Sequence, residues 1–543
     1  MENSQISTQQ KTPNWLKILV ICLVVLGIFF RFAHLGEKVY WYDETATSLA
    51  ISGHTPAEVK QQIMQYEDVI SIATLDKYKH INPERGIADT LRYLVTSDPQ
   101  HPPFYYVMVR LWAQVFGDSH AAIRSLSAII SLLIFPCVYW LCLELFASPV
   151  AAWIGMALMA VSPLEVYFAQ EARQYGLWMV TILLSSAALL SAMRRETKVS
   201  WVVYTFSLAL GLYTHLFTVL VAISHGIYVL ANQQFRWHKK ILNYLISTLV
   251  SFLIFLPWII VLIAHIDTAL NLTSWTSLKI ANPFDLIGIW LSRISRIFFD
   301  INLATDSHVI IDLATESPLS YSLISIITIS LMLGFLIVFY TKNNANKISS
   351  FISLLGGVFG LSFLLYDLIF GGIRSIHFRY QLPLYLSIQL AVTYVLAYYL
   401  VSDKIWQQKL TQLIVSGLII IGISSDIALF NQNSWWAKIS GKNLIEMSQI
   451  VQGYKQPLLL VHDDIYNILF TLTLSHSLDA KARLLTIHNN QPLSLPQEYN
   501  HIFLLGTDNS LIEKISNDKN YTVKLIYPHE EFWQIEKIPS SNI

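Results

Sequence analysis

Residues 15–44 read WLKILVICLVVLGIFFRFAHLGEKVYWYDE. The run from 15 to 32 is almost entirely apolar, and a helix that crosses a membrane needs about 20 such residues. It shows no small-residue site at which a secretory signal would be cleaved, so we expect it to remain as the first membrane helix. Two adjacent carboxylates, Asp43 and Glu44, follow soon after this helix. The stretch therefore predicts a membrane protein with polar chemistry close to the membrane surface.

The composition of the whole chain agrees with this reading. The 543 residues are 54% hydrophobic and 13% charged, whereas about 25% of the residues in a soluble domain are charged. A water-soluble core could not bury so much apolar surface, but a bilayer can cover it. The 36 basic and 36 acidic residues balance, so the basic excess typical of nucleic-acid binding is absent and no nucleic-acid partner is expected.

Hydropathy predicts an all-α polytopic protein with about eleven transmembrane helices. We place them near residues 15–34, 121–146, 149–169, 173–193, 200–215, 217–233, 241–265, 320–341, 349–371, 381–402 and 409–430. With this count, the short loops that are rich in Lys and Arg all fall on one side. The positive-inside rule assigns that side to the cytoplasm.

Three long segments then face away from the cytoplasm. Two belong to a transmembrane domain over 1–430: a first outer loop at 36–120 and a second at 266–319. Apolar residues recur at helical spacing within 283–299, which predicts an amphipathic helix on the membrane surface. The third segment, 431–543, reads as a small extracytoplasmic α/β domain. Its apolar runs predict strands at 458–461, 484–487, 501–505 and 522–526, with a helix near 509–517.

Polar residues cluster at the outward ends of the predicted spans. Inserting an ionisable side chain at membrane depth costs about 2.5–3.5 kcal/mol of free energy, so such clusters are candidates for functional sites. Asp43 and Glu44 could orient an acceptor and take its proton, or they could simply form the first turn of a helix. Asp98 and His101 precede an aromatic helix that we expect to end at Gly117. The simpler reading of His101 is a hydrogen-bonded turn residue.

Two more clusters follow the third and fifth predicted spans. Glu171, Arg173 and Tyr175 lie in one short junction. The planar fork of Arg173 suits a phosphate, although an internal Glu–Arg ion pair that ties two helices would explain it equally well. His215 lies at the next outward turn, where a structural histidine is the simpler reading.

The fifth cluster contains His377 and Arg379, in an outward loop with three basic groups. This breaks the positive-inside trend and favours an anionic partner such as a lipid phosphate. The alternative is anchoring at the interface by snorkelling side chains. Because all five clusters fall on one face, we expect them to converge on one cavity at the outer leaflet.

The order and placement of these motifs resemble the GT-C superfamily of membrane glycosyltransferases, in particular the protein-O-mannosyltransferase and aminoarabinose transferase branch. The resemblance spans about residues 15 to 400, and the tail from 431 shows no motif. It rests on Asp43-Glu44, His101-Pro102-Pro103, Tyr105-Tyr106, Phe116-Gly117, Arg124-Ser125-Leu126-Ser127-Ala128, Glu171-Ala172-Arg173-Gln174-Tyr175, Tyr213-Thr214-His215 and Arg379-Tyr380.

The resemblance implies that a sugar is moved, with inversion, from a polyprenyl-phosphate carrier to an acceptor protein, lipid or glycan. Asp43 matches the catalytic carboxylate of the family and would act as base, assisted by Glu44. Asp98 and His101 match the segment that lines the same cavity, where some relatives carry a lysine or a second acid. The carrier phosphate would be held by groups from the later motifs, and Glu171 and His215 belong to the same matching motifs. These phosphate-binding groups are Arg173, Tyr175, His377 and Arg379.

The chemistry fits these roles. Arginine can neutralise a departing phosphate ester, so no strong general acid is needed. We expect burial at bilayer depth to raise the pKa of the catalytic carboxylate. No cofactor is required, although a divalent metal could bind among the acids and the histidine of the first outer loop.

Other classes of protein stay open at this point. They are a transporter or flippase of lipid-linked saccharides, a surface-polysaccharide ligase or polymerase, and a non-catalytic scaffold with the same fold. A transporter would more often carry its polar groups near the membrane midplane and in repeated halves. For the enzyme, we expect a multi-pass plasma (inner) membrane location among lipids, with the site and the tail outside the cytoplasm.

Overall fold

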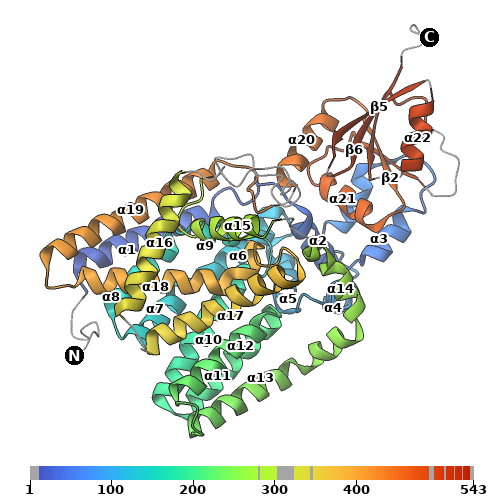
Figure 1. The fold of residues 1–543 in the computed structure, drawn as a ribbon. Coiled ribbons are helices and arrows are strands. Elements are labelled where there is room, and N and C mark those ends of the chain that lie inside the picture. Colours follow the sequence, from blue (N-terminus) through green and yellow to red (C-terminus); the bar gives the residue numbers. More distant parts are fainter. Residues whose placement is uncertain are drawn as a thin grey trace.

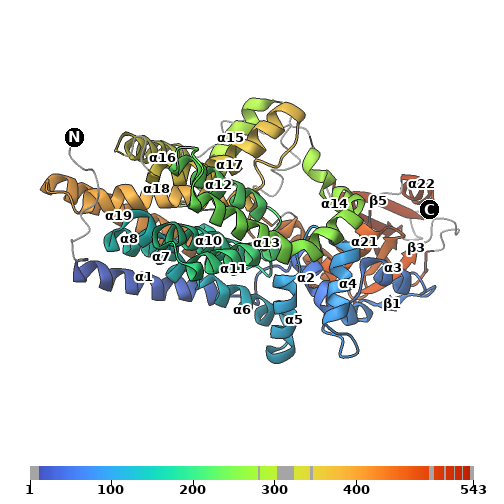
Figure 2. The ribbon, with the colours of Figure 1, turned by 90° about the horizontal axis from the view of Figure 1, so that it is seen from below.

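A computed structural model gives the architecture (Figure 1). It describes residues 12–278, 282–301, 323–342, 347–438, 440–487, 495–506, 509–518, 520–528 and 530–538. The described chain is mostly helical, with a single mixed sheet formed largely by the tail. Figures 1 and 2 show the long helices bundled at one end of the molecule and the sheet at the other, with the first outer loop beside the sheet.

The long apolar helices confirm a multi-pass membrane protein. Within the described residues, seven helical segments are long and apolar enough to cross a bilayer. They are α1 (Asn14–Phe32), α6–α7 (His120–Ser131 and Ile134–Phe146), α10 (Tyr175–Arg195), α13 (Lys239–Ala264), α17 (Lys347–Phe370), η6–α18 (Phe378–Gln381 and Leu382–Leu400) and α19 (Ile405–Phe430). The pair α8 (Pro149–Ala160) and α9 (Pro163–Ala169) is bent by 60° and would make an eighth.

The predicted count of about eleven spans is therefore not confirmed. Two of the predicted spans form helices of 17 and 15 residues, α11 (Lys198–Thr214) and α12 (Thr218–Asn232), which are shorter than a full crossing. The described apolar part of α16 (Leu323–Lys342) is also short. Hydropathy alone locates apolar segments well, but it does not reveal where a helix bends or stops.

The bend between α8 and α9 brings distant segments together. Pro163 disfavours helical backbone at the residue before it, which ends α8. Arg31, at the end of α1, donates to the freed carbonyls of Met159 at 2.8 Å and Ala160 at 3.2 Å, so the broken helix keeps its hydrogen bonds. The amide of Gln170 donates to carbonyls at the end of α1 as well. The segment that follows α9 is thereby held beside the C-terminal end of α1.

The sheet has six strands in the order β1-β3-β2-β4-β6-β5. Its strands are β1 (Ile70–Ser71), β2 (Leu458–His462), β3 (Arg483–Ile487), β4 (His501–Leu505), β5 (Tyr521–Tyr527) and β6 (Phe532–Lys537). The central strand β2 pairs in parallel with β3 and β4, and the outer pairs are antiparallel. All four predicted strands and the predicted helix α22 (Asn509–Asn517) are confirmed. Sequence analysis missed β6, and it missed β1, which belongs to the first outer loop.

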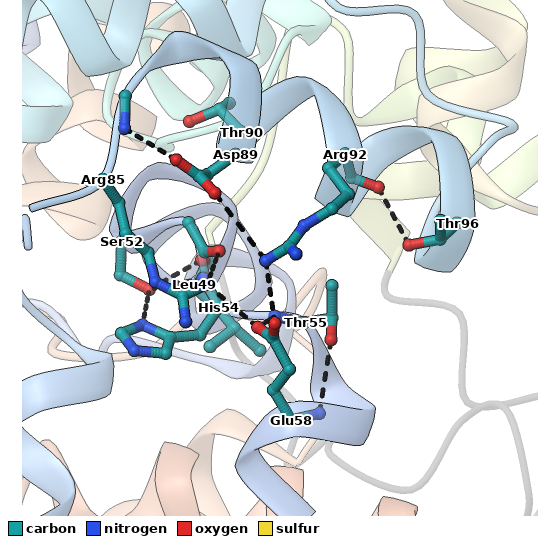
Figure 3. A network of polar contacts seen from close by, with 12 residues as sticks. Leu49, Ser52, His54, Thr55, Glu58, Arg85, Asp89, Thr90, Arg92 and Thr96 are labelled. Carbon is teal, nitrogen blue, oxygen red and sulfur yellow. Dashed lines mark hydrogen bonds and ion pairs between the residues drawn. The ribbon is translucent and has the colours of Figure 1, made fainter.

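The first outer loop is largely helical. It contains α2 (Tyr42–Ser52), α3 (Pro56–Ile63), η1 (Ile72–Tyr78), α4 (Ile87–Ser97) and α5 (Phe104–Phe116). Figure 3 shows the polar network that braces α3 against α4: Glu58 pairs with Arg85 at 2.9 Å and Arg92 at 2.8 Å. Glu58 also completes a capping box with Thr55, which fixes the start of α3. As predicted, α5 ends at Gly117, whose φ of +87° suits glycine.

The tail is fastened to this loop. Besides the β1–β3 pairing, Lys60 pairs with Asp463 at 2.8 Å, and the rings of His120 and His476 are bonded at 3.0 Å. Helix α21 (Ile465–Ser475) packs against α2 and α3. Helix α20 (Gly441–Gln452) of the tail packs against α21. The loop and the tail thus form one continuous packed region next to the bundle (Figure 1).

The predicted amphipathic helix in the second outer segment is present as α15 (Pro283–Ser295), which ends earlier than 299. It follows α14 (Ile266–Thr273) and η2 (Ser274–Ser277). Its buried side contains Leu286, Ile289 and Ile294 together with Arg293. The predicted apolar face is therefore only partly correct, because Ile287 is exposed. The part of the predicted segment from 302 to 319 lies outside the described residues.

Candidate active site

Helix α2 carries the two carboxylates and presents them in different directions. It begins at Tyr42 after an extended Trp41, so Asp43 lies in the first turn and is not the cap. Glu44 is fully buried, whereas the side chain of Asp43 is 22% exposed. The partly exposed residues of α2 are Tyr42, Asp43 and Ala46. A narrow strip of the helix around Asp43 is therefore open.

Asp43 forms an ion pair with Arg379, which lies in η6 just before α18. Arg379 also donates to the hydroxyl of Tyr175 at 3.1 Å. Its guanidinium carbon lies 5.2 Å from the ring centroids of both Trp41 and Tyr175. Residues from the first, third and fifth predicted clusters therefore meet at one point.

Arg173 reaches the same point from the junction between α9 and α10. Its Nη1 donates to the backbone carbonyl of Asp43 at 3.1 Å, and its Nη2 lies 3.1 Å from Nε2 of His101. Nδ1 of His101 lies 2.7 Å from the Asp98 carboxylate. A guanidinium can only donate hydrogen bonds, so Nε2 of His101 must be the acceptor for Arg173. The proton of the ring then sits on Nδ1, which donates a hydrogen bond to the Asp98 carboxylate. Asp98, His101 and Arg173 thus form a directed chain of hydrogen bonds.

The pKa of Asp43 differs from our expectation. Burial raises it, but the guanidinium groups of Arg379 and Arg173 outweigh burial and lower the pKa of Asp43 to about 2. The predicted raised pKa of the catalytic carboxylate is therefore wrong for this state of the site. The reason is the ion pair with Arg379, which the sequence does not reveal.

Glu44 has a different environment. Its carboxylate accepts two bonds from Arg124, at 2.6 and 2.7 Å, one from Nζ of Lys438 at 2.9 Å and one from the N–H of Ala172 at 2.9 Å. Burial would raise its pKa, but the two cations lower the pKa of Glu44 to about 2. Both oxygens already accept two hydrogen bonds, so this geometry suits a positioning group better than a proton acceptor.

Glu171 is buried beside these two networks. It accepts a hydrogen bond from the indole Nε1 of Trp41 at 3.1 Å. Burial raises the pKa of Glu171 to about 7, and the nearby Arg379 offsets part of this rise. The Glu–Arg ion pair considered from the sequence does not describe Arg173, whose guanidinium is directed toward Asp43 and His101.

The two remaining predicted histidines lie in an aromatic layer next to Arg379. His215 stacks on Trp178 with centroids 4.0 Å apart, and its Nδ1 accepts the N–H of Phe217 at 3.2 Å. His377 meets the rings of Trp275 and Tyr380 edge to face, at 4.7 and 4.8 Å. His215 therefore has the contacts of a structural histidine. Neither His215 nor His377 forms a hydrogen bond with the carboxylate of Asp43 in the part of the chain that the structure describes.

Two residues of the site were not assigned from the sequence. Arg124 lies within one of the motifs on which the resemblance rests, but the motif gave it no role. Lys438 lies in the tail, where no motif was visible, and its contact with Glu44 joins residues 394 positions apart. Only the folded chain reveals such a pairing.

The acids and the histidine of the first outer loop do not surround a common point. Among the residues that the structure describes, no group of three or more His, Cys, Asp or Glu is arranged to hold a metal ion. The carboxylates of Asp43, Glu44 and Asp98 are turned toward arginine, lysine or histidine partners.

Part of the chain that contains the site matches a known protein family. Residues 100–261 match the family model described as dolichyl-phosphate-mannose-protein mannosyltransferase. The matched segment contains His101, Glu171, Arg173, Tyr175 and His215. The predicted resemblance to membrane glycosyltransferases is confirmed for this segment. No curated protein matches the chain.

Several solved structures are similar to the chain. ArnT from Cupriavidus metallidurans, bound to undecaprenyl phosphate, has 10% identity and a TM-score of 0.49, covering 97% of this chain and 99% of that one. The Archaeoglobus fulgidus oligosaccharyltransferase with a tethered acceptor peptide has 13% identity and a TM-score of 0.47, covering 85% and 63%. The S. cerevisiae Pmt1-Pmt2 complex bound to the sugar donor has 14% identity and a TM-score of 0.33, covering 48% and 35%.

Proposed function

We propose that the chain is a glycosyltransferase that moves a sugar from a polyprenyl-phosphate carrier to an acceptor on the extracytoplasmic face. The observation that carries this proposal is the meeting of one carboxylate, Asp43, with two arginines, Arg173 and Arg379, from separate segments. The family match over 100–261 supports the same class of reaction. A base and a phosphate clamp side by side are what such a transfer requires.

The two arginines would bind the carrier phosphate. Each presents a planar fork that can donate two parallel hydrogen bonds to phosphate oxygens. The hydroxyl of Tyr175 lies 3.1 Å from Arg379 and can donate a further bond once the phosphate is present. As the bond between the sugar and the phosphate breaks, negative charge grows on the phosphate, and these fixed donors stabilise it.

Asp43 would accept the proton of the acceptor hydroxyl. The acceptor oxygen forms a bond to the anomeric carbon while the bond from that carbon to the phosphate oxygen breaks, which inverts the anomeric centre. The proton goes to Asp43, and polyprenyl phosphate leaves. A carboxylate with a pKa near 2 is a weak base. An incoming phosphate competes for Arg379, so donor binding would raise the pKa of Asp43 and activate it.

The acceptor would approach from the side of the tail. Tyr42 and Ala46 are the other open residues of α2. The ring of Tyr466, which is 54% exposed, lies 5.8 Å from that of Tyr42. Tyr466 in turn stacks on the buried Phe470 and is held in place. An aromatic platform from the tail therefore stands beside the base and can contact an acceptor.

The test is transfer by the purified protein in liposomes, supplied with a panel of polyprenyl-phosphate sugars and with protein, lipid or glycan acceptors. Mass spectrometry of the acceptors should detect one added sugar for one donor. The Asp43→Asn variant should not add it. A matched control is Asp76→Asn, because the 51% exposed Asp76 lies in the same loop but away from the arginines. A protein that only translocates lipid-linked saccharide would modify no acceptor and would overturn the proposal.

A further inference from the structure

Lys438 is a buried lysine in the tail, between α19 and α20. Its side chain is 4% exposed, although lysine is almost never buried without a partner. Its Nζ donates to the Glu44 carboxylate at 2.9 Å and to the carbonyl of Val39 at 3.0 Å. Lys438 therefore reaches out of the tail into the region directly behind the site.

Glu44 already has a full partner without Lys438. Arg124 binds it with two parallel hydrogen bonds and spends its other N–H groups on three backbone carbonyls before α2. One arginine neutralises one carboxylate. The second cation must therefore be explained by something other than charge balance.

The second cation can be explained by the backbone of Ala172, which Glu44 holds in place. Glu44 and Thr47 are three residues apart and share one face of α2. Glu44 accepts the N–H of Ala172 at 2.9 Å, and the hydroxyl of Thr47 donates to the carbonyl of Ala172, also at 2.9 Å. Both polar groups of this residue are clamped to α2.

Arg173 is the next residue along the chain. Its guanidinium donates to the backbone carbonyl of Asp43. Because the two bonds from α2 to Ala172 fix the backbone next to Arg173, they also set the distance between the Arg173 side chain and the carboxylate of Asp43. A phosphate held by Arg173 is correctly placed for Asp43 only while this clamp stays closed. Small displacements of such groups have large effects on transfer rates.

We propose that Lys438 is a positioning residue of the active site: together with Arg124 it holds Glu44 in place, and Glu44 and Thr47 then fix Ala172 and Arg173 against Asp43. This inference rests on the proposed function. It makes the tail a working part of the site, because the loop and the bundle supply every other member of the clamp.

The alternative is that Lys438 only fastens the tail to the bundle. The two roles differ in the pH dependence of transfer. Without Lys438, one of the two cations that keep the pKa of Glu44 low is lost, so this carboxyl takes up a proton at higher pH and weakens its hold on Ala172. A merely structural lysine would not move the acid limb of the activity profile. The ionisable groups that interact with Glu44 include Tyr40, Tyr105, His120, Arg124, Tyr167, Glu171 and Lys438.

The experiment measures kcat/KM for transfer between pH 4 and 8, with the full-length protein in liposomes. For Lys438→Met we expect a loss on the order of tenfold to hundredfold at neutral pH. We also expect an acid limb that moves up into this pH range from the pKa of about 2 that Glu44 has in the wild type. Lys438→Arg keeps the charge and should restore the acid limb. Lys442→Met is the control, since Lys442 follows closely in the tail but is 52% exposed. An unmoved acid limb in Lys438→Met would overturn the inference.

A second variant covers the case in which Lys438→Met does not fold. Thr47→Val removes the other half of the clamp without changing any charge, and it should raise the KM for donor while leaving the acid limb in place. Unchanged donor KM in Thr47→Val would contradict the clamp. If the wild-type protein adds no sugar to any acceptor of the panel, the proposed function itself fails. If Asp43→Asn is inactive and Lys438→Met behaves like the wild type, only the present inference fails.

Discussion

The carboxylate of Asp43 and the guanidinium of Arg379 form an ion pair across 336 residues of sequence. The pair joins the first outer loop to the last part of the transmembrane bundle. It also keeps Asp43 in a state with a low pKa. In the proposed reaction, the carrier phosphate takes over Arg379 and leaves Asp43 free to accept a proton.

Replacement of Arg379 by lysine tests the phosphate clamp. Lysine keeps the positive charge but loses the planar fork that donates two parallel hydrogen bonds. We expect Arg379→Lys to weaken binding of polyprenyl phosphate by about 1.5–3 kcal/mol, roughly tenfold or more. Titration of the lipid into the protein in detergent micelles measures this. Arg92→Lys, at a 48% exposed arginine of the first outer loop, should bind as the wild type does, and equal binding by both variants would speak against the clamp.

His101 tests the directed chain from Asp98 to Arg173. In His101→Gln, the side-chain oxygen can still accept from Arg173, so we expect most of the donor affinity to remain. In His101→Lys, a second cation faces Arg173, and like charges at close range repel. We expect this variant to lose donor binding and transfer. Equal behaviour of the two variants in a donor-binding assay would show that His101 does not act as an acceptor for Arg173.

Glu171 gives a prediction for stability as a function of pH. Its pKa is raised to about 7 in the folded protein, because burial disfavours its charged form. The folded state therefore holds this proton more tightly than the unfolded state, and stability falls as the pH rises from about 4.5 to about 7. Glu171→Gln removes this loss and keeps an acceptor for Trp41. Thermal unfolding in detergent should show a higher Tm than wild type at pH 8 and little difference at pH 4.5, and a lower Tm at pH 8 would contradict it.

Tyr466 tests the acceptor side. Tyr466→Ala removes the exposed ring from the platform next to Tyr42, so we expect the KM for acceptor to rise severalfold while the KM for donor stays the same. An aromatic contact of this kind is worth roughly 0.5–1.5 kcal/mol. Tyr466→Phe keeps the ring and should behave nearly as the wild type. Steady-state kinetics with each substrate varied in turn separate the two KM values. A rise in the KM for donor alone would show that Tyr466 does not contact the acceptor.

Much of the fold can be predicted from the sequence, for identifiable reasons. Apolar runs of membrane length predict the bundle, and short apolar runs predict the strands β2 to β5. The count of spans is not confirmed, because α11 and α12 are short and the described residues contain seven helical segments of crossing length, or eight with the bent pair α8–α9. β1 has two residues, too few for any pattern to reveal.

The site could be predicted in part. Asp43, His101, Arg173, Tyr175 and Arg379 were grouped because their motifs fall on one face, and the structure brings them into contact. The direction of the pKa shift of Asp43 was missed, since it depends on a partner far away in the chain. The same holds for Lys438, whose partner is known only after folding.

The most direct measurement is the single-turnover rate of sugar transfer by Asp43→Asn, with donor binding measured on the same preparation. The asparagine cannot take the proton and no longer pairs with Arg379. We therefore predict that transfer slows by on the order of 10²–10⁴-fold, while the donor lipid binds at least as tightly as it does to the wild type. A variant that transfers sugar at the wild-type rate would contradict the assignment of Asp43 as the base.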